Sequence, residues 1–251
     1  EYQHALNSLN EAQKLFNFIK NHGELLDVLF MQAKLYYKIG DHRELEKKIY
    51  EFSTTYSEYN LSDGFRSYQE LLKNFLSFGK ADLILVEELK IIQDEFFKRK
   101  DEHNFVESVF LLIQFYIKQG RYTEAIGELS NPRLIDLCSQ NSILEAEREY
   151  FLGIISKNYE SDKFLSPLVY FEKVYDLIKD ESVTELTWKV MYEISQLYIE
   201  RGNYTKAKRF VVYARELIYF IAEKLESPQL RAAYLKNSER LEPLKKLETF
   251  Y

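Results

Sequence analysis

The stretch LYIERGNYTKAKRFVVYA, residues 197–214, contains two helical patterns separated by a glycine. In the segment that leads into Gly202, apolar and aromatic residues recur at spacings of three and four, which is the period of an α-helix. Glycine can take the left-handed backbone conformation that ends a helix, because it has no Cβ atom to clash. The second pattern starts at Tyr204 and places Ala207 and Ala214 on one face, where small residues let a neighbouring helix approach closely. The stretch predicts two antiparallel helices joined by a short turn.

The same arrangement recurs along the chain. Apolar segments rich in aromatic residues also end in glycine at Gly40, Gly79 and Gly120, so the glycines follow one another at intervals of 39, 41 and twice 41 residues. The missing step falls near residue 161, where Asp162 stands in place of glycine, and aspartate is among the residues that best tolerate the left-handed conformation. A period near 40 residues predicts a series of stacked helix hairpins.

Composition favours a folded, helical protein. The 251 residues are 46% hydrophobic and 29% charged, which excludes disorder, and eight glycines and four prolines are few for an all-β fold. The net charge of −6 argues against a nucleic-acid partner, and no apolar run approaches the length of about 20 residues that a membrane span needs. A single cysteine, Cys138, excludes an internal disulfide and agrees with a reducing, cytoplasmic location.

These residues resemble the tetratricopeptide family of helical repeats. Its consensus combines a small residue, an aromatic residue, glycine, a second aromatic residue and alanine, and the last block matches at Ser195, Tyr198, Gly202, Tyr204 and Ala207. The third and first blocks keep most of the pattern, at Tyr116, Gly120, Tyr122 and Ala125, and at Ala33, Tyr36 and Gly40. The resemblance implies an all-α fold, a right-handed α-solenoid of antiparallel helix pairs. A period near 40 residues is longer than is usual in this family, so HEAT-like or armadillo-like pairs stay open as alternatives.

The period and the resemblance make residues 1–251 one helical-repeat domain. Five helix pairs are preceded by a half-repeat and followed by a C-terminal cap. The predicted ranges are 1–22 for the half-repeat, 24–59, 62–100, 104–140, 143–180 and 183–225 for the pairs, and 226–251 for the cap. We expect the half-repeat to be the second helix of a pair, which either caps the solenoid or packs on a helix from a longer chain.

The sequence contains no recognisable catalytic motif. The four histidines, His4, His22, His42 and His103, have no metal-binding spacing among themselves or with Cys138. No glycine-rich phosphate loop and no nucleophile elbow is present. Carboxylates from different helices could still converge, which the sequence does not exclude. We therefore expect no enzyme activity, no cofactor and no metal.

The tetratricopeptide resemblance implies that three positions of each first helix face a concave groove. Aromatic residues for contact area, with glutamine and lysine for hydrogen bonds, would suit an extended peptide or a helix there. We expect Lys34 and Lys73 to be exposed in this groove. In the alternative interpretation, Phe30, Phe110 and Tyr192 pack between helices instead. The candidate groove residues are Phe30, Lys34, Tyr37, Gln69, Lys73, Phe110, Gln114, Tyr192 and Gln196.

The sequence thus predicts a non-enzymatic scaffold or sensory module that binds a protein or peptide and relays binding to other domains of a longer chain. Repeat domains of this kind occur in bacterial signalling proteins, and this resemblance is architectural. One alternative is an assembly surface, including a homodimer, formed by exposed aromatic residues such as Tyr2, Phe250 and Tyr251. The other alternative is a phosphatase-like helical-repeat regulator.

Overall fold

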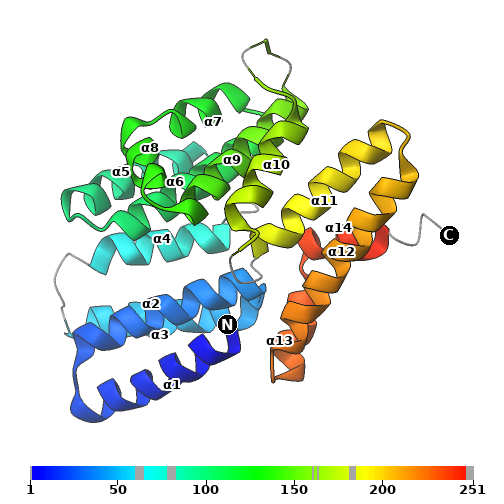
Figure 1. The fold of residues 1–251 in the computed structure, drawn as a ribbon. Helices are drawn as coiled ribbons and strands as arrows, with labels where there is room; N and C mark the ends of the chain where they lie inside the picture. The colour runs from blue at the N-terminus through cyan, green and yellow to red at the C-terminus, as the bar shows by residue number, and fades with distance from the viewer. Residues whose placement is uncertain are drawn as a thin grey trace. The chain divides into compact units, whose positions relative to one another are not determined.

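A computed structural model describes residues 2–59, 65–77, 83–159, 161–162, 164–180 and 185–246. The regular structure within these ranges is entirely helical, with α1 to α14 following one another along the chain and no strand (Figure 1). The prediction of an all-α fold is confirmed. The right-handed superhelix and its period of about 40 residues stay predictions. No helix in these ranges combines the length and the apolar character that crossing a bilayer requires.

The chain forms two compact units. Unit 1 comprises Glu1–Ser108 and Ala222–Asn237, and unit 2 comprises Val109–Ile221 and Ser238–Tyr251. The boundaries fall inside α6 (Glu102–Lys118) and near the end of α12 (Tyr204–Glu223). Both units are discontinuous in sequence, because a C-terminal segment returns to each of them. One repeat domain over residues 1–251 stays a prediction.

Most helices of unit 1 pack against their neighbours in the chain. It contains α1 (Tyr2–Ile19), α2 (His22–Ile39), α3 (His42–Tyr59), α4 (Arg66–Ser77), α5 (Leu83–Lys98), the first residues of α6, and α13 (Pro228–Lys236). The α2 helix contacts α1, α3, α4 and α13, and α4 also contacts α3 and α5. Leu26, Ala33 and Leu45 are fully shielded from solvent, so α2 and α3 supply the centre of this core.

Unit 2 contains α7 (Tyr122–Leu129), α8 (Pro132–Ser139), α9 (Ser142–Asn158), α10 (Pro167–Ile178), α11 (Glu185–Glu200) and α14 (Ser238–Lys246), with most of α6 and α12. Contacts join α9 to α7, α8 and α10, and α10 to α11. The range 104–140 differs from the predicted pair, because two short helices replace its second helix. Asn131 accepts a hydrogen bond from the backbone N–H of Arg133, and Pro132 stands in the first turn of α8, so a new helix begins there.

Three of the predicted glycine turns are confirmed. Gly40, Gly120 and Gly202 have φ values of 90°, 69° and 70°, which lie in the left-handed region. After Gly40, the N–H of Asp41 donates to the carbonyl oxygen of Tyr36 at 3.0 Å and closes the end of α2. The predicted turn at Gly79 lies outside the described residues.

Two further helix ends use the left-handed conformation without glycine. Lys20 and Lys100, with φ values of 56° and 60°, follow α1 and α5. The fourth predicted turn, near Asp162, does not have the predicted geometry. The α9 helix already ends at Asn158, and Tyr159 after it is extended (φ −132°, ψ 108°), so no left-handed residue caps this helix.

Candidate functional site

The nine predicted groove residues belong to two separate units. Phe30 and Phe110 are only 3% and 5% exposed. Their rings lie against Tyr68 and Phe151, at centroid distances of 4.6 Å and 5.4 Å, so these two residues pack between helices, in agreement with the alternative interpretation. Unit 1 holds Phe30, Lys34, Tyr37, Gln69 and Lys73, and unit 2 holds Phe110, Gln114, Tyr192 and Gln196. Their role as a ligand groove stays a prediction.

The remaining candidates of unit 1, apart from Lys34, lie at least partly open to solvent. Tyr37 is half-buried and stacks on Phe75, with ring centroids 4.4 Å apart. Gln69 donates from Nε2 to Ser53 Oγ at 2.9 Å. The side chain of Lys73 is 51% exposed, as expected, and forms an ion pair with Glu70 at 2.8 Å.

The remaining candidates of unit 2, Gln114, Tyr192 and Gln196, are half-buried. Burial, together with the negative charges of Glu242 and Glu193, raises the pKa of Tyr192 to about 12. Gln196 donates a long hydrogen bond to the neighbouring Ser195 Oγ at 3.3 Å. None of these contacts identifies a ligand.

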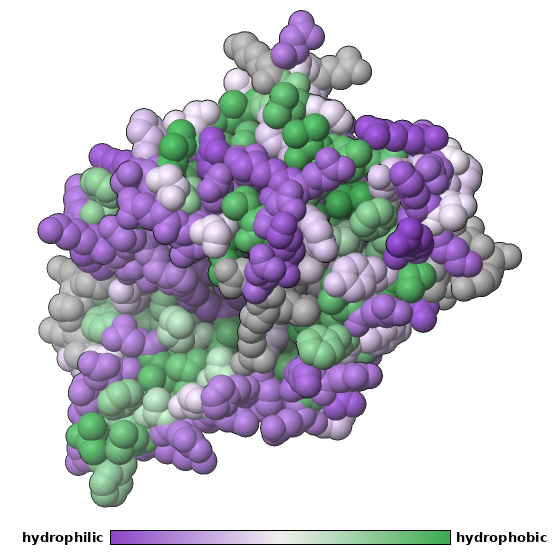
Figure 2. All heavy atoms as spheres, in the orientation of Figure 1, coloured by the Kyte–Doolittle hydropathy of each residue, from purple (hydrophilic) through white to green (hydrophobic). Residues whose placement is uncertain are grey.

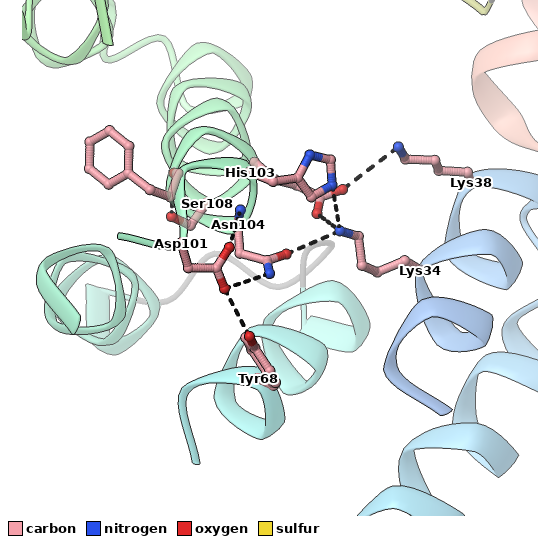
Figure 3. Close-up of polar contacts among 9 residues, drawn as sticks. Lys34, Lys38, Tyr68, Asp101, His103, Asn104 and Ser108 are labelled. Carbon is pink, nitrogen blue, oxygen red and sulfur yellow. Dashed lines mark hydrogen bonds and ion pairs between the residues drawn. The ribbon is translucent and has the colours of Figure 1, made fainter. Parts of the chain in front are cut away.

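The prediction that Lys34 is an exposed groove residue is wrong, because only 4% of Lys34 is exposed. Its Nζ forms an ion pair with Glu107 and donates to Asn104 Oδ1 at 3.1 Å. His103 Nε2 lies 3.1 Å from the same Nζ and accepts from it as a neutral imidazole. Figure 3 shows these contacts converging on Lys34, which comes from α2, whereas its partners come from the start of α6.

The network continues from Asn104 to α4. Asn104 donates from Nδ2 to Asp101 Oδ2 at 2.8 Å, and the hydroxyl of Tyr68 donates to the same oxygen at 2.9 Å (Figure 3). Lys34, Tyr68, Asp101, His103, Asn104 and Glu107 are called the Lys34 cluster below. The cluster joins α2, α4 and α6 within unit 1.

Burial governs the electrostatics of the Lys34 cluster. It lowers the pKa of Lys34, an effect that the attraction of Glu107 opposes. It also lowers the pKa of His103, and the positive charge of Lys34 adds to that effect. Burial, together with the hydrogen bond to Asp101, raises the pKa of Tyr68. The groups of the cluster satisfy one another, so we interpret the cluster as a polar cross-link between helices rather than a ligand site.

Unit 2 contains an open cavity of about 460 Å³ between α10, α11 and α12. Four aromatic residues line it, namely Tyr175, Tyr198, Phe210 and Tyr213. Its aliphatic lining is Leu168, Met191 and Ile194. Helical spacing explains this arrangement, because Met191, Ile194 and Tyr198 are three and four residues apart on α11, and Phe210 and Tyr213 are three apart on α12. The volume falls within the range of small ligand sites, about 300–1,000 Å³.

The charged groups of the cavity are both acidic. Glu172 and Asp176 line it from α10, four residues apart and therefore on one helix face. Asp176 forms an ion pair with Lys179 at 3.1 Å, and both of these side chains are largely exposed. On the aromatic side, the rings of Tyr198 and Phe210 stack at 5.6 Å, and Lys206 Nζ lies 5.2 Å from the centroid of the Tyr198 ring.

Neither the Lys34 cluster nor the cavity was predicted from the sequence. Tyr198 was named only as a match to the repeat consensus. The groove prediction chose Tyr192 and Gln196 on α11, whereas the cavity uses Met191, Ile194 and Tyr198 of the same helix. The available signal was the alignment of Leu168, Glu172 and Asp176 at spacings of four, which is common on solvated helices.

Two observations in the described ranges concern metal-binding and thiol chemistry. They contain no group of three or more histidine, cysteine, aspartate or glutamate side chains that could hold a metal ion. Cys138 is buried, and burial raises the pKa of its thiol to about 11, so the thiol is protonated at neutral pH.

No protein-family model matches this chain, and a search of curated proteins finds no matching relative.

Proposed function

We propose that the protein is a non-enzymatic binding module that takes up a peptide segment of a partner protein in the cavity of unit 2. The observation that carries this proposal is the open cavity itself, which combines four aromatic side chains with two carboxylates. Aromatic residues supply a large contact area at a low cost in side-chain entropy, and they dominate the binding energy of many protein interfaces. The cavity replaces the concave groove as the most favourable site, because Phe30, Lys34 and Phe110 are buried.

Helix hairpins closed by short turns support the proposal further. Glycines in the left-handed conformation follow α2, α6 and α11, as in tetratricopeptide-like repeats. We propose this repeat type for the chain. Stacked hairpins of this kind are a common framework for peptide binding.

Selection of peptides tests the proposed function. Random peptides displayed on phage are selected against the intact chain, and the affinities of the selected peptides are measured by fluorescence anisotropy. Replacing Tyr175 and Tyr213, which are 40% and 44% exposed, by alanine should weaken binding by about tenfold or more.

Tyr219→Ala is the matched control, because Tyr219 is 42% exposed on the same α12 helix but does not line the cavity. Its affinity for the selected peptides should equal that of the unaltered chain. Failure to select any peptide, or equal binding by the Tyr175→Ala/Tyr213→Ala variant, would rule out the proposed function at this cavity.

One observation favours assembly as a second candidate function. Leu15, Phe18 and Ile19, near the end of α1, are 55%, 85% and 52% exposed. Figure 2 shows hydrophobic residues gathered at the lower left of the view, over that end of α1. Tyr2, by contrast, is half-buried near Tyr234, with ring centroids 6.3 Å apart, and Phe250 and Tyr251 lie outside the described residues.

Sedimentation velocity measures whether copies of the chain assemble into an oligomer. If α1 forms an interface between copies, the chain sediments as an oligomer and Phe18→Ser sediments as a monomer. Tyr50→Ser is the control, because Tyr50 is 72% exposed on α3. A chain that stays monomeric at all concentrations eliminates the assembly function.

A further inference from the structure

We propose that the cavity of unit 2 seats one positively charged side chain, a lysine or arginine of the bound peptide. This inference rests on the proposed function and names the chemical group that enters the cavity. The observation behind it is the charge of the lining. Glu172 and Asp176 contribute two carboxylates, and none of the described lining residues is a lysine, arginine or histidine.

The two carboxylates are available to an incoming cation. Both residues are exposed and lie one helical turn apart on α10, so a single ammonium or guanidinium group can approach both. Asp176 has an internal partner in Lys179, but the side chains of that pair are 68% and 47% exposed. Exposed pairs of this kind are weak, so a ligand cation that is also held by other groups can replace Lys179.

The aromatic rings supply the second attraction. Lys206 Nζ lies 5.2 Å from the ring centroid of Tyr198 and already uses that ring, so a ligand cation would use the other rings of the cavity. Tyr175 and Tyr213 expose 40% and 44% of their surface and offer further rings.

The aliphatic lining completes the match. Lysine and arginine carry three or four methylene groups before the charge, and such stems pack well on apolar surface. Half-buried Leu168 provides such surface, and Met191 and Ile194, which are 2% and 4% exposed, lie at the base of the cavity. A neutral aliphatic side chain would use these contacts but neither the carboxylates nor the ring faces, and an acidic side chain would be repelled.

The two methionines of the chain provide a direct measurement. Met191 lines the cavity, whereas Met31 lies on α2 in unit 1 and is 42% exposed. The intact chain, labelled with ¹³C at the methionine methyl groups, is titrated with acetyl-Gly-Lys-Gly-amide and followed by NMR. The Met191 signal should shift and saturate, and the Met31 signal should stay in place.

A neutral analogue isolates the charge. Acetyl-Gly-norleucine-Gly-amide has the same stem without the ammonium group, and it should bind about fivefold more weakly. Changing Glu172→Gln together with Asp176→Asn should remove most of this preference. Asp136→Asn, which alters an exposed carboxylate of α8 outside the cavity, should retain it.

The outcomes separate this inference from the proposed function. Equal affinity for the lysine and norleucine peptides would contradict a site for a positively charged side chain, and the cavity would remain a peptide site. Selected peptides that bind while neither tripeptide moves the Met191 signal would likewise contradict only the site for a positively charged side chain. Tighter binding of putrescine than of the lysine tripeptide identifies a site for a free amine and overturns the assignment to a peptide side chain.

Discussion

Lys34 and Lys73 lie in opposite environments although the sequence predicts the same exposed role for both. Lys34 is 4% exposed beside Glu107, whereas the side chain of Lys73 is 51% exposed. Lys34→Glu would bury a carboxylate next to Glu107 and should lower the free energy of unfolding by about 3–5 kcal/mol. Lys73→Glu should change it by about 0.5 kcal/mol or less. Urea denaturation measures both, and equal losses would show that Lys34 is not enclosed.

A double substitution tests whether Lys34 and Glu107 depend on each other for their contribution to stability. Lys34→Met leaves Glu107 without its main positive partner, so much of the loss reflects an uncompensated charge. Adding Glu107→Leu removes that charge, and the double variant should therefore be more stable than Lys34→Met alone. A double variant that is less stable than either single variant contradicts this view.

His103 should make the stability of the protein sensitive to mild acid. Burial and the positive charge of Lys34 lower its folded-state pKa below 6.5, with Lys38 acting in the same direction and Glu107 and Asp101 against it. The unfolded chain therefore binds the proton first as the pH falls, so stability rises with pH and is lost on acidification below about pH 6.5.

His103→Gln should consequently flatten the decline in the free energy of unfolding between about pH 7.5 and 5.5. His4→Gln, at an exposed position of α1, serves as the control and should keep the decline. The measurement is urea denaturation at a series of pH values. An unchanged slope in His103→Gln would refute the assigned role of the imidazole.

At the scale of helices, Gly153 sets the distance between α9 and α10. A Cβ atom at Gly153 would lie 2.6 Å from Cε1 of Phe171, whose ring is fully buried. Gly153→Ala should therefore destabilise the protein by about 1–3 kcal/mol. Gly127→Ala is the matched control, because nothing lies within 4 Å of its Cβ position in α7, and it should stabilise by about 0.5–1 kcal/mol. Thermal unfolding of both variants checks the opposite signs, and two losses of equal size would contradict the close contact.

Helices could be predicted where their signals are local. The range 24–59 contains α2 and α3 almost completely, because a left-handed glycine and the apolar period mark those helices within a few residues. The left-handed ends at Lys20 and Lys100 were missed because lysine, which has a Cβ atom, rarely adopts the left-handed conformation, so the residue type did not mark them. The break between α7 and α8 has a local signal in Asn131 and Pro132, an N-cap followed by proline, which the prediction from the repeat period did not use.

The sites could not be predicted in the same way, because their partners are distant in sequence. Lys34 contacts Asn104 and Glu107, which lie about 70 residues later in the sequence. The periodicity within α2 does not predict these contacts. The cavity likewise requires three helices to bring residues 168 to 213 together. Local patterns state which face of a helix is apolar, whereas the identity of the opposing face depends on how the helices pack.

Because the chain forms two compact units, we expect each unit to unfold locally without the other. Tyr234 of α13 is fully buried in unit 1, where α13 contacts α2, and Phe171 of α10 is fully buried in unit 2. Tyr234→Ala and Phe171→Ala should each cost about 3–5 kcal/mol, since both remove a large ring from a closed core. Because each unit has its own core, the loss of hydrogen-exchange protection should stay local.

Hydrogen exchange followed by mass spectrometry distinguishes the two variants. Tyr234→Ala should raise exchange in α1 and α2 and leave α9 and α10 protected, whereas Phe171→Ala should do the reverse. The variants serve as controls for each other, because the same loss of a buried ring falls on different units. If both variants raised exchange equally in all four helices, the chain would unfold as a single cooperative body, since no unit would retain protection when the other loses its core.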